Sequence, residues 1–302
     1  MNKIFKKIII VTIVLAIVGV SWVTLTGGGI VPPDIETPPA SASPSATDKP
    51  APGSLGDVIL NAMEGTKGEY GIIVKNLKTG ETYSANEHRI YEPGSLYKLW
   101  VMATAFSQIQ SGVLDENEEL SEQISVLNTK FGVDPETAEL KEGGITLTVG
   151  QAITQMITIS HNYASFLLLE KIRSSAIQSY LGKNGFNESF IGESPAATSY
   201  DIALFFEKLY KGELANKENT EKMLAILKKQ QLNGGLPKYL PQEAEVAHKT
   251  GDIDWLKHDA GIVFSDKGNY IIVIMSESDS PAGAQERIAK TSKAVYDYFE
   301  GK

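Results

Sequence analysis

The sequence has no cysteine among its 302 residues. This absence excludes disulfide bonds, thiolate zinc sites, iron–sulfur clusters, a cysteine nucleophile and lipidation at a cysteine. Histidine is scarce, with four scattered residues, and the net charge is −9. Because an acidic surface repels a phosphate backbone, we expect no nucleic-acid partner. The chain is 42% hydrophobic, which is typical of a globular protein and excludes a wholly disordered one.

The first 25 residues have the pattern of a membrane segment. Lys3, Lys6 and Lys7 precede residues 8–25, a run without charge that is just long enough to cross a hydrocarbon core. A cleaved signal peptide is the alternative, but its apolar region is usually shorter, and no clear small-residue cleavage site follows. We therefore predict an uncleaved anchor over residues 1–25. It would make a single-pass protein of the cell membrane, with its N-terminus cytoplasmic and its catalytic domain extracytoplasmic.

A linker and one domain follow the predicted anchor. Residues 26–54 contain seven of the thirteen prolines, together with many serines and alanines, and are typical of a semi-extended tether. Residues 55–302 contain no further low-complexity break and no internal repeat. We expect them to form a single domain.

Hydrophobic periodicity predicts the elements of this domain. Alternating or continuous apolar runs predict strands at 70–77, 81–84, 245–250, 260–264 and 270–275. Helical spacing predicts helices at 95–110, 149–156, 163–172, 200–210, 220–229 and 282–299. This order predicts an α/β sandwich with an antiparallel sheet assembled from both chain ends, flanked by helices, and an inserted helical subdomain.

Ser95 and Lys98 are the first residues that suggest chemistry. They lie three apart at the start of a predicted helix, so their side chains share one face. A lysine in a crowded, partly buried site can lose its proton and accept one from a serine, and free amides at a helix start can stabilise an oxyanion. A capping serine beside a solvated lysine is the alternative for this pair taken alone.

Two further groups follow in the chain. Ser160 and Asn162 precede a predicted helix, where a serine can relay a proton and an asparagine can hold a substrate amide; a helix-capping serine is the alternative. Lys249, Thr250 and Gly251 end a predicted strand, where they can bind a carboxylate close to the backbone; an ordinary turn is the alternative. The conjunction of all three groups, in this order, favours catalysis.

This conjunction resembles the serine penicillin-recognising enzymes, and most closely the class A β-lactamase type. The likeness covers residues 55–302 and includes ITLTVGQAITQMITISHNYASFLLLEKI around Ser160 and AATSYDIALFFEKLYKGEL around Asp201. The resemblance implies a β-lactamase/transpeptidase-like fold with a five-stranded sheet. It also implies a reaction that needs neither a metal nor another cofactor.

The resemblance assigns four catalytic residues. Ser95 would be the acylated nucleophile and Lys98 its activating base or proton relay. Ser160 would pass a proton to the leaving nitrogen, and Lys249 would set the electrostatics around Ser160. The substrate would be a β-lactam or a D-alanyl-D-alanine stem peptide, which share a carboxylate and an amide carbonyl.

The resemblance also assigns substrate-binding residues. Asn162 would bind the side-chain amide of the substrate, and Thr250 its carboxylate, beside Gly251. The backbone N–H groups of Ser95 and Asp252 would form the oxyanion hole.

Two departures from the family pattern concern His161 and one loop. His161 stands where class A enzymes usually have aspartate, a change that we interpret as tolerated. The loop between residues 182 and 198 is shorter by about ten residues and lacks the Glu-x-x-Leu-Asn segment. The glutamate that activates the hydrolytic water is therefore unassigned, with Glu188 and Glu193 as candidates that are otherwise solvated loop carboxylates.

The histidines give no sign of a metal site. His248 and His258 lack a third ligand at zinc spacing, so we expect them to be ordinary strand and loop residues.

Three functions compete on these grounds. The first is a membrane-anchored β-lactamase-type hydrolase, monomeric, with slow deacylation. The second is a penicillin-binding D-alanyl-D-alanine carboxypeptidase or endopeptidase, which the missing glutamate favours. The third is a sensory module that binds β-lactam or peptidoglycan without turnover, which the complete catalytic set disfavours.

Overall fold

The structure is a computed structural model that describes residues 50–301. The predicted anchor and all but the last five residues of the predicted linker lie outside this range, so those boundaries remain predictions. Within residues 50–301, no helix is both long and apolar enough to cross a membrane.

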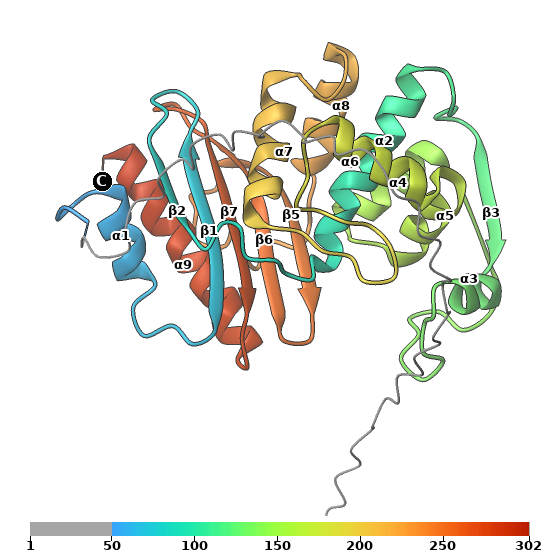
Figure 1. Cartoon of the computed structure of the whole chain (residues 1–302), viewed down its shortest axis with the longest axis horizontal. Coiled ribbons are helices and arrows are strands. Elements are labelled where there is room, and N and C mark those ends of the chain that lie inside the picture. The colour runs from blue at the N-terminus through green and yellow to red at the C-terminus, as the bar shows by residue number, and fades with distance from the viewer. Residues whose placement is uncertain (1–49, 302) are drawn as a thin grey trace, which may run out of the picture. The chain divides into compact units, whose positions relative to one another are not determined.

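A five-stranded antiparallel sheet is built from both ends of the described chain (Figure 1). Its strands are β1 (Glu69–Asn76), β2 (Thr82–Ala85), β5 (Glu245–Ile253), β6 (Leu256–Phe264) and β7 (Tyr270–Glu277). Their order is β2-β1-β7-β6-β5, so the last strand in sequence pairs with the first. The predicted fold class is confirmed.

The central strand β7 shows why both faces of the sheet are covered. Its side chains are almost continuously apolar, as expected for a strand buried on both sides. Tyr270, Ile272 and Ile274 pack toward α1 (Leu55–Ala62) and α9 (Pro281–Glu300). The alternate residues Ile271, Val273 and Met275 join the core of the opposite face. Figure 1 shows α9 along one face and α7 (Ser199–Lys211) against the other.

The helical subdomain is organised around α2 (Lys98–Gln110), in which every residue from Lys98 to Phe106 is buried. A helix that is buried all round needs neighbours on every side. These neighbours include α4 (Val149–Thr158), α5 (Asn162–Ile172), α6 (Ser174–Lys183) and α8 (Lys217–Leu227). A short ribbon of β3 (Glu119–Gln123) and β4 (Gly144–Thr148), with α3 (Ile124–Lys130), completes the subdomain at its rim.

Several elements differ from the predicted ones. The predicted helix 95–110 begins as a 3-10 turn, η1 (Gly94–Tyr97), and becomes α-helical at Lys98. The predicted helix 220–229 begins earlier, at Lys217, because the Asn216 side chain caps it. The ribbon of β3 and β4 escaped prediction because β3 is largely polar and β4 is short. In β4, Ile145 and Leu147 alternate with threonines, but none of its five residues is fully buried.

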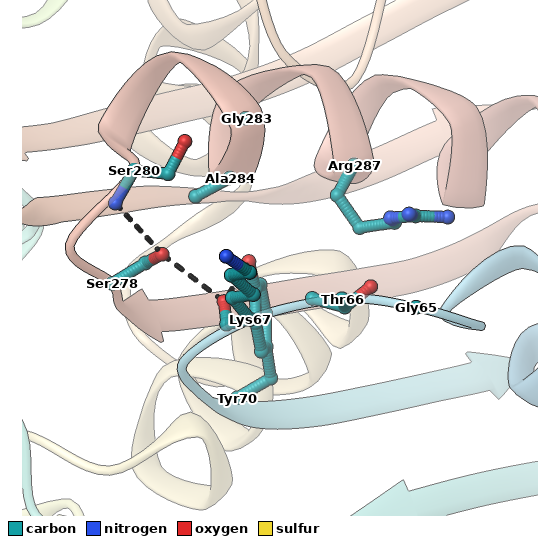
Figure 2. Close-up of a pocket in the computed structure, with 9 residues that line it drawn as sticks. All are labelled: Gly65, Thr66, Lys67, Tyr70, Ser278, Ser280, Gly283, Ala284 and Arg287. Atoms are coloured by element: carbon teal, nitrogen blue, oxygen red, sulfur yellow. Dashed lines mark hydrogen bonds between the residues drawn. The ribbon is translucent and has the colours of Figure 1, made fainter.

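Hydrogen bonds connect the turn between α1 and β1 to the end of β7 and the start of α9 (Figure 2). Ser278 Oγ donates to the Lys67 carbonyl at 3.0 Å and accepts from the Ser280 amide at 3.2 Å. Arg287 on α9 donates to the Ala62 carbonyl at 2.5 Å. A pocket of about 190 Å³ remains between these contacts, on the side of the sheet covered by α1 and α9.

Candidate active site

Lys98 lies at the start of the buried helix α2, one turn after the half-buried Ser95 on η1. Its side chain has 0% exposure, yet its amine is well provided with acceptors. Lys98 Nζ donates to the Ser160 carbonyl at 2.6 Å and to Asn162 Oδ1 at 2.8 Å, and it lies 3.2 Å from Ser160 Oγ. The first two predicted groups therefore meet in space.

Ser160 joins α4 to α5 in a left-handed backbone conformation, with φ of 58°. A residue with a Cβ adopts this conformation at some cost, so the surroundings must hold it there. The bond from Lys98 to its carbonyl is one such restraint. Ser160 Oγ is placed between two amines, Lys98 Nζ at 3.2 Å and Lys249 Nζ at 3.0 Å.

The capping role suggested as an alternative for Ser160 belongs instead to His161. His161 Nδ1 accepts from the Ala164 amide at 3.2 Å at the start of α5. An imidazole that accepts at Nδ1 is neutral there, and burial lowers the pKa of His161, with Glu139 opposing the shift and Lys98 adding to it. Histidine thus caps the helix where aspartate would also serve as a cap.

Lys249 on β5 brings the third predicted group to the same place. Its side chain is 0% exposed, and Nζ donates to the Thr250 carbonyl at 2.9 Å as well as to Ser160 Oγ. Burial lowers the pKa of Lys249 from 10.5 to about 7, against the opposing charges of Asp259 and Asp252.

The two lysines share one hydroxyl in a desolvated site. Burial, followed by the charge of Lys249, lowers the pKa of Lys98 well below 10.5, with Glu139 opposing. Desolvation disfavours both ammonium forms, and the two charges repel each other. A neutral amine here is a base that can accept a proton from a serine hydroxyl.

Two glycines let the sheet edge approach the η1 turn. A Cβ at Gly251 would lie 2.5 Å from the Pro93 carbonyl oxygen. Gly94 has φ of 49°, and a Cβ there would lie 3.1 Å from the Asp252 amide nitrogen. The backbone of β5 at Gly251 and Asp252 thus lies directly against the turn that carries Ser95.

The carboxylate of Asp252 is exposed and forms an ion pair with Lys257 at 3.3 Å. Thr250, two residues before it, is buried with 6% exposure. All the predicted substrate-binding residues of β5 therefore lie on the stretch of strand that faces η1.

Glu139 is a site residue that the sequence did not single out. Asn162 Nδ2 donates to Glu139 Oε1 at 2.9 Å, while Asn162 Oδ1 accepts from Lys98. Glu139 lies on the exposed loop between α3 and β4. Because Glu136 and Glu142 are also exposed on this loop, no local pattern distinguishes the carboxylate that reaches the site.

Glu188 and Glu193, the candidates for water activation, lie outside these contacts. Glu188 Oε1 pairs with His88 Nδ1 at 2.8 Å, and Oε2 accepts from Thr198 Oγ1 at 2.8 Å. Glu193 is exposed in the short turn between Phe190 and Ala196, which form a β-bridge. Neither carboxylate takes part in the network of Lys98, Ser160 and Lys249 described above.

His248 and His258 are buried and use both ring nitrogens in hydrogen bonds. His248 bonds to Asp259 Oδ1 at 2.8 Å and to Asn233 Oδ1 at 3.1 Å. His258 Nδ1 accepts from the Ser276 amide at 2.9 Å, and Nε2 donates to the Glu92 carbonyl at 2.9 Å. Within the described part of the chain, no three His, Asp or Glu side chains form a group that could hold a metal ion.

Comparison with known protein families agrees with this geometry. The family model described as "Beta-lactamase enzyme family" matches residues 54–299. The chain belongs to this family. The resemblance to the serine penicillin-recognising enzymes is thereby confirmed, together with a serine-hydrolase fold. No curated protein sequence matches the chain.

Solved structures with the same fold include β-lactamases and a protein named PBP-A. A β-lactamase from Sphaerobacter thermophilus is 21% identical with a TM-score of 0.73, covering 82% of this chain and 97% of its own. PBP-A is 22% identical, with a TM-score of 0.72 and coverages of 82% and 96%. The extended-spectrum β-lactamase TLA-3 is 20% identical, with a TM-score of 0.72 and coverages of 81% and 98%. At these identities, the likeness establishes the fold.

Because the pKa of Lys249 is lowered, we expect the free energy of unfolding to depend on pH. Because the folded-state pKa is about 7 and the ordinary value is 10.5, the unfolded chain binds more protons between these pH values. Stability attributable to this residue therefore rises with pH in that window. Relative to Lys249→Met, the wild type should gain up to about 4 kcal/mol in free energy of unfolding from pH 7 to pH 10. Urea unfolding of both proteins at several pH values measures this difference.

The exposed Lys229 supplies a control for this measurement. Lys229→Met also removes one lysine, but an exposed one, so the difference between the wild type and this variant should not change with pH in the same way. A difference between the wild type and Lys249→Met that stays constant across the pH range would contradict the placement of Lys249 in a desolvated site.

Proposed function

We propose that this protein is a membrane-anchored extracytoplasmic serine hydrolase that forms an acyl-enzyme with β-lactams through Ser95. The observation that carries the proposal is the position of Ser160 Oγ, 3.2 Å from Lys98 Nζ and 3.0 Å from Lys249 Nζ. A hydroxyl between two desolvated amines is suited to relaying a proton rather than to capping a helix.

Acylation follows from this arrangement. The neutral amine of Lys98 takes the proton of Ser95, whose oxygen then attacks the lactam carbonyl carbon. The N–H groups of Ser95 and Asp252 stabilise the developing oxyanion, since Gly94 and Gly251 let the two backbones approach. Ser160 passes its proton to the departing nitrogen and takes one from the Lys98 ammonium, 3.2 Å away, while the lactam C–N bond breaks to leave the ester on Ser95.

The substrate is held by groups on both sides of Ser95. Lys249 and Thr250 face its carboxylate from β5, and the Asn162 amide faces its acyl side chain from α5. A structure of a variant of PBP-A, 21% identical to this chain, is an acyl-enzyme complex with penicillin G, which supports a β-lactam as the ligand.

Deacylation is the slow step in this proposal. Hydrolysis of the ester requires a base that takes a proton from water near the acyl carbonyl. The short loop lacks the family's Glu-x-x-Leu-Asn segment, and Glu188 is engaged by His88 and Thr198. The acyl-enzyme should therefore be long-lived.

A D-alanyl-D-alanine carboxypeptidase or endopeptidase of cell-wall metabolism is the second candidate. The same missing base favours it, because such an enzyme is not required to hydrolyse β-lactam esters quickly. A sensory module without turnover is the third candidate. The complete set of Ser95, Lys98, Ser160 and Lys249 disfavours it, since ligand recognition alone does not need all four.

In this proposal, the domain is monomeric and lies outside the cell membrane. It is supported by the uncharged run at residues 8–25 after three lysines, and by the proline-rich residues 26–54 that would separate the membrane from the domain.

Ser95→Ala should abolish labelling by penicillin G, because among residues 50–301 no other serine stands one helical turn from a buried lysine. Lys98→Met should slow acylation by about 10²- to 10⁴-fold through loss of the base. Intact mass spectrometry measures the adduct. Ser111→Ala, at the exposed end of α2, is the control and should label normally. An adduct on Ser95→Ala would refute the assignment of the nucleophile.

Stopped-flow traces with a chromogenic cephalosporin should show a stoichiometric burst followed by a slow steady state. The reason is that acylation has its full set of groups and deacylation lacks its base. Rapid multiple turnover without a burst would overturn slow deacylation. If Glu193→Gln or Glu188→Gln then abolished that turnover, the short loop would be the source of the base.

The full-length protein should fractionate with membranes, and protease added from outside should release the domain by cutting within residues 26–54. Immunoblotting of the fractions and N-terminal sequencing of the released domain measure this outcome. A mature protein that begins near Gly29 would instead demonstrate a cleaved signal peptide.

A further inference from the structure

The floor of the site is lined by amines and its rim by carboxylates. The floor contains the amines of Lys98 and Lys249, both fully buried. The rim contains acidic residues on both sides, with Glu139 on the helical side and Asp252 on the sheet side, both exposed. A ligand that spans the site would therefore contact amines at the floor and carboxylates at the rim.

The two rim carboxylates, Glu139 and Asp252, differ in their partners. Asp252 is paired with Lys257 at 3.3 Å. Among residues 50–301, no lysine, arginine or histidine forms an ion pair with Glu139, whose hydrogen bond is with Asn162. Its negative charge opposes the lowering of the pKa of both Lys98 and His161 that burial causes, so the charge acts on the site.

The orientation of the Asn162 amide is determined by its two neighbours. The Glu139 carboxylate can only accept, so the Nδ2 amino group faces it, and Oδ1 is left to accept from Lys98. A substrate carbonyl that binds to Asn162 Nδ2 therefore arrives beside the Glu139 carboxylate. A charged substituent on the α-carbon next to that carbonyl would therefore lie close to Glu139.

We propose that Glu139 selects ligands whose acyl side carries a protonated amine, so that the substrate class is zwitterionic, with a carboxylate for Lys249 and Thr250 and an ammonium for Glu139. This inference rests on the proposed function and specifies its substrate. An ammonium beside the bound amide gains an ion pair at the rim, and a carboxylate in the same position is repelled.

Three penicillins with the same nucleus and phenyl side chain provide the test. Penicillin G, ampicillin and carbenicillin differ at the side-chain α-carbon, which carries hydrogen, an ammonium or a carboxylate. The second-order rate constant of acylation, followed by intact mass spectrometry, should be highest for ampicillin and lowest for carbenicillin. Each step in charge should change it by about two- to fivefold, as for an exposed ion pair. The ratio of ampicillin to carbenicillin should decrease with added salt.

Two variants separate selectivity from other roles. Glu139→Gln should bring the ampicillin-to-carbenicillin ratio close to one, whatever its effect on all three rates. Glu136→Gln removes an exposed carboxylate from the same loop and should leave the ratio as in the wild type. A ratio that survives in Glu139→Gln, with all three rates reduced equally, would overturn the proposal and make Glu139 a positioning residue for Lys98.

Failure of the proposed function gives a different result. If none of the three penicillins acylates the wild-type protein, acyl transfer to β-lactams is refuted. Reversible binding of the same three compounds to the wild type and to Glu139→Gln then tests selectivity by calorimetry. The same order of affinity, lost in the variant, supports the role of Glu139, and equal affinities contradict it.

Discussion

Two lysine amines buried on either side of one serine hydroxyl are the constraint on which the site depends. Desolvation of Lys98 and Lys249 lowers the pKa of each, and their proximity opposes simultaneous protonation. Ser160 adopts a left-handed conformation to bring its Oγ between them. Such a site is unfavourable to assemble unless the surrounding fold holds all three residues, so the architecture can be understood as its support.

Three parts of the chain provide that support. The buried helix α2 carries Lys98, the junction of α4 and α5 carries Ser160, and the edge strand β5 carries Lys249. Close approach of β5 to η1 requires glycine at positions 94 and 251. His258 strengthens the same contact, since it bonds β6 to the Glu92 carbonyl just before η1. Helices and a strand thus position Lys98, Ser160 and Lys249, whereas the neighbouring Glu139 lies on a loop.

The carboxylates considered for this site come from two loops. Glu188 is held by Thr198 and by His88, which lies between β2 and η1, whereas Glu139 contacts Asn162. The carboxylate that contacts Asn162 therefore comes from the loop between α3 and β4. This distribution separates Glu188 from the contacts of Lys98, Ser160 and Lys249, whereas Glu139 borders them through Asn162.

The sequence by itself indicated the five-stranded sheet and most of the helices, and it put forward Ser95, Lys98, Ser160 and Lys249 as candidates. Apolar periodicity is local, and each motif stands at the start or end of an element, so both can be recognised without knowing what packs where. Only the tertiary structure decided that His161 rather than Ser160 caps α5, and that Glu139 rather than Glu188 meets the site. These outcomes depend on contacts between distant segments. Exposed carboxylates look alike along the chain until the fold brings one of them beside a partner.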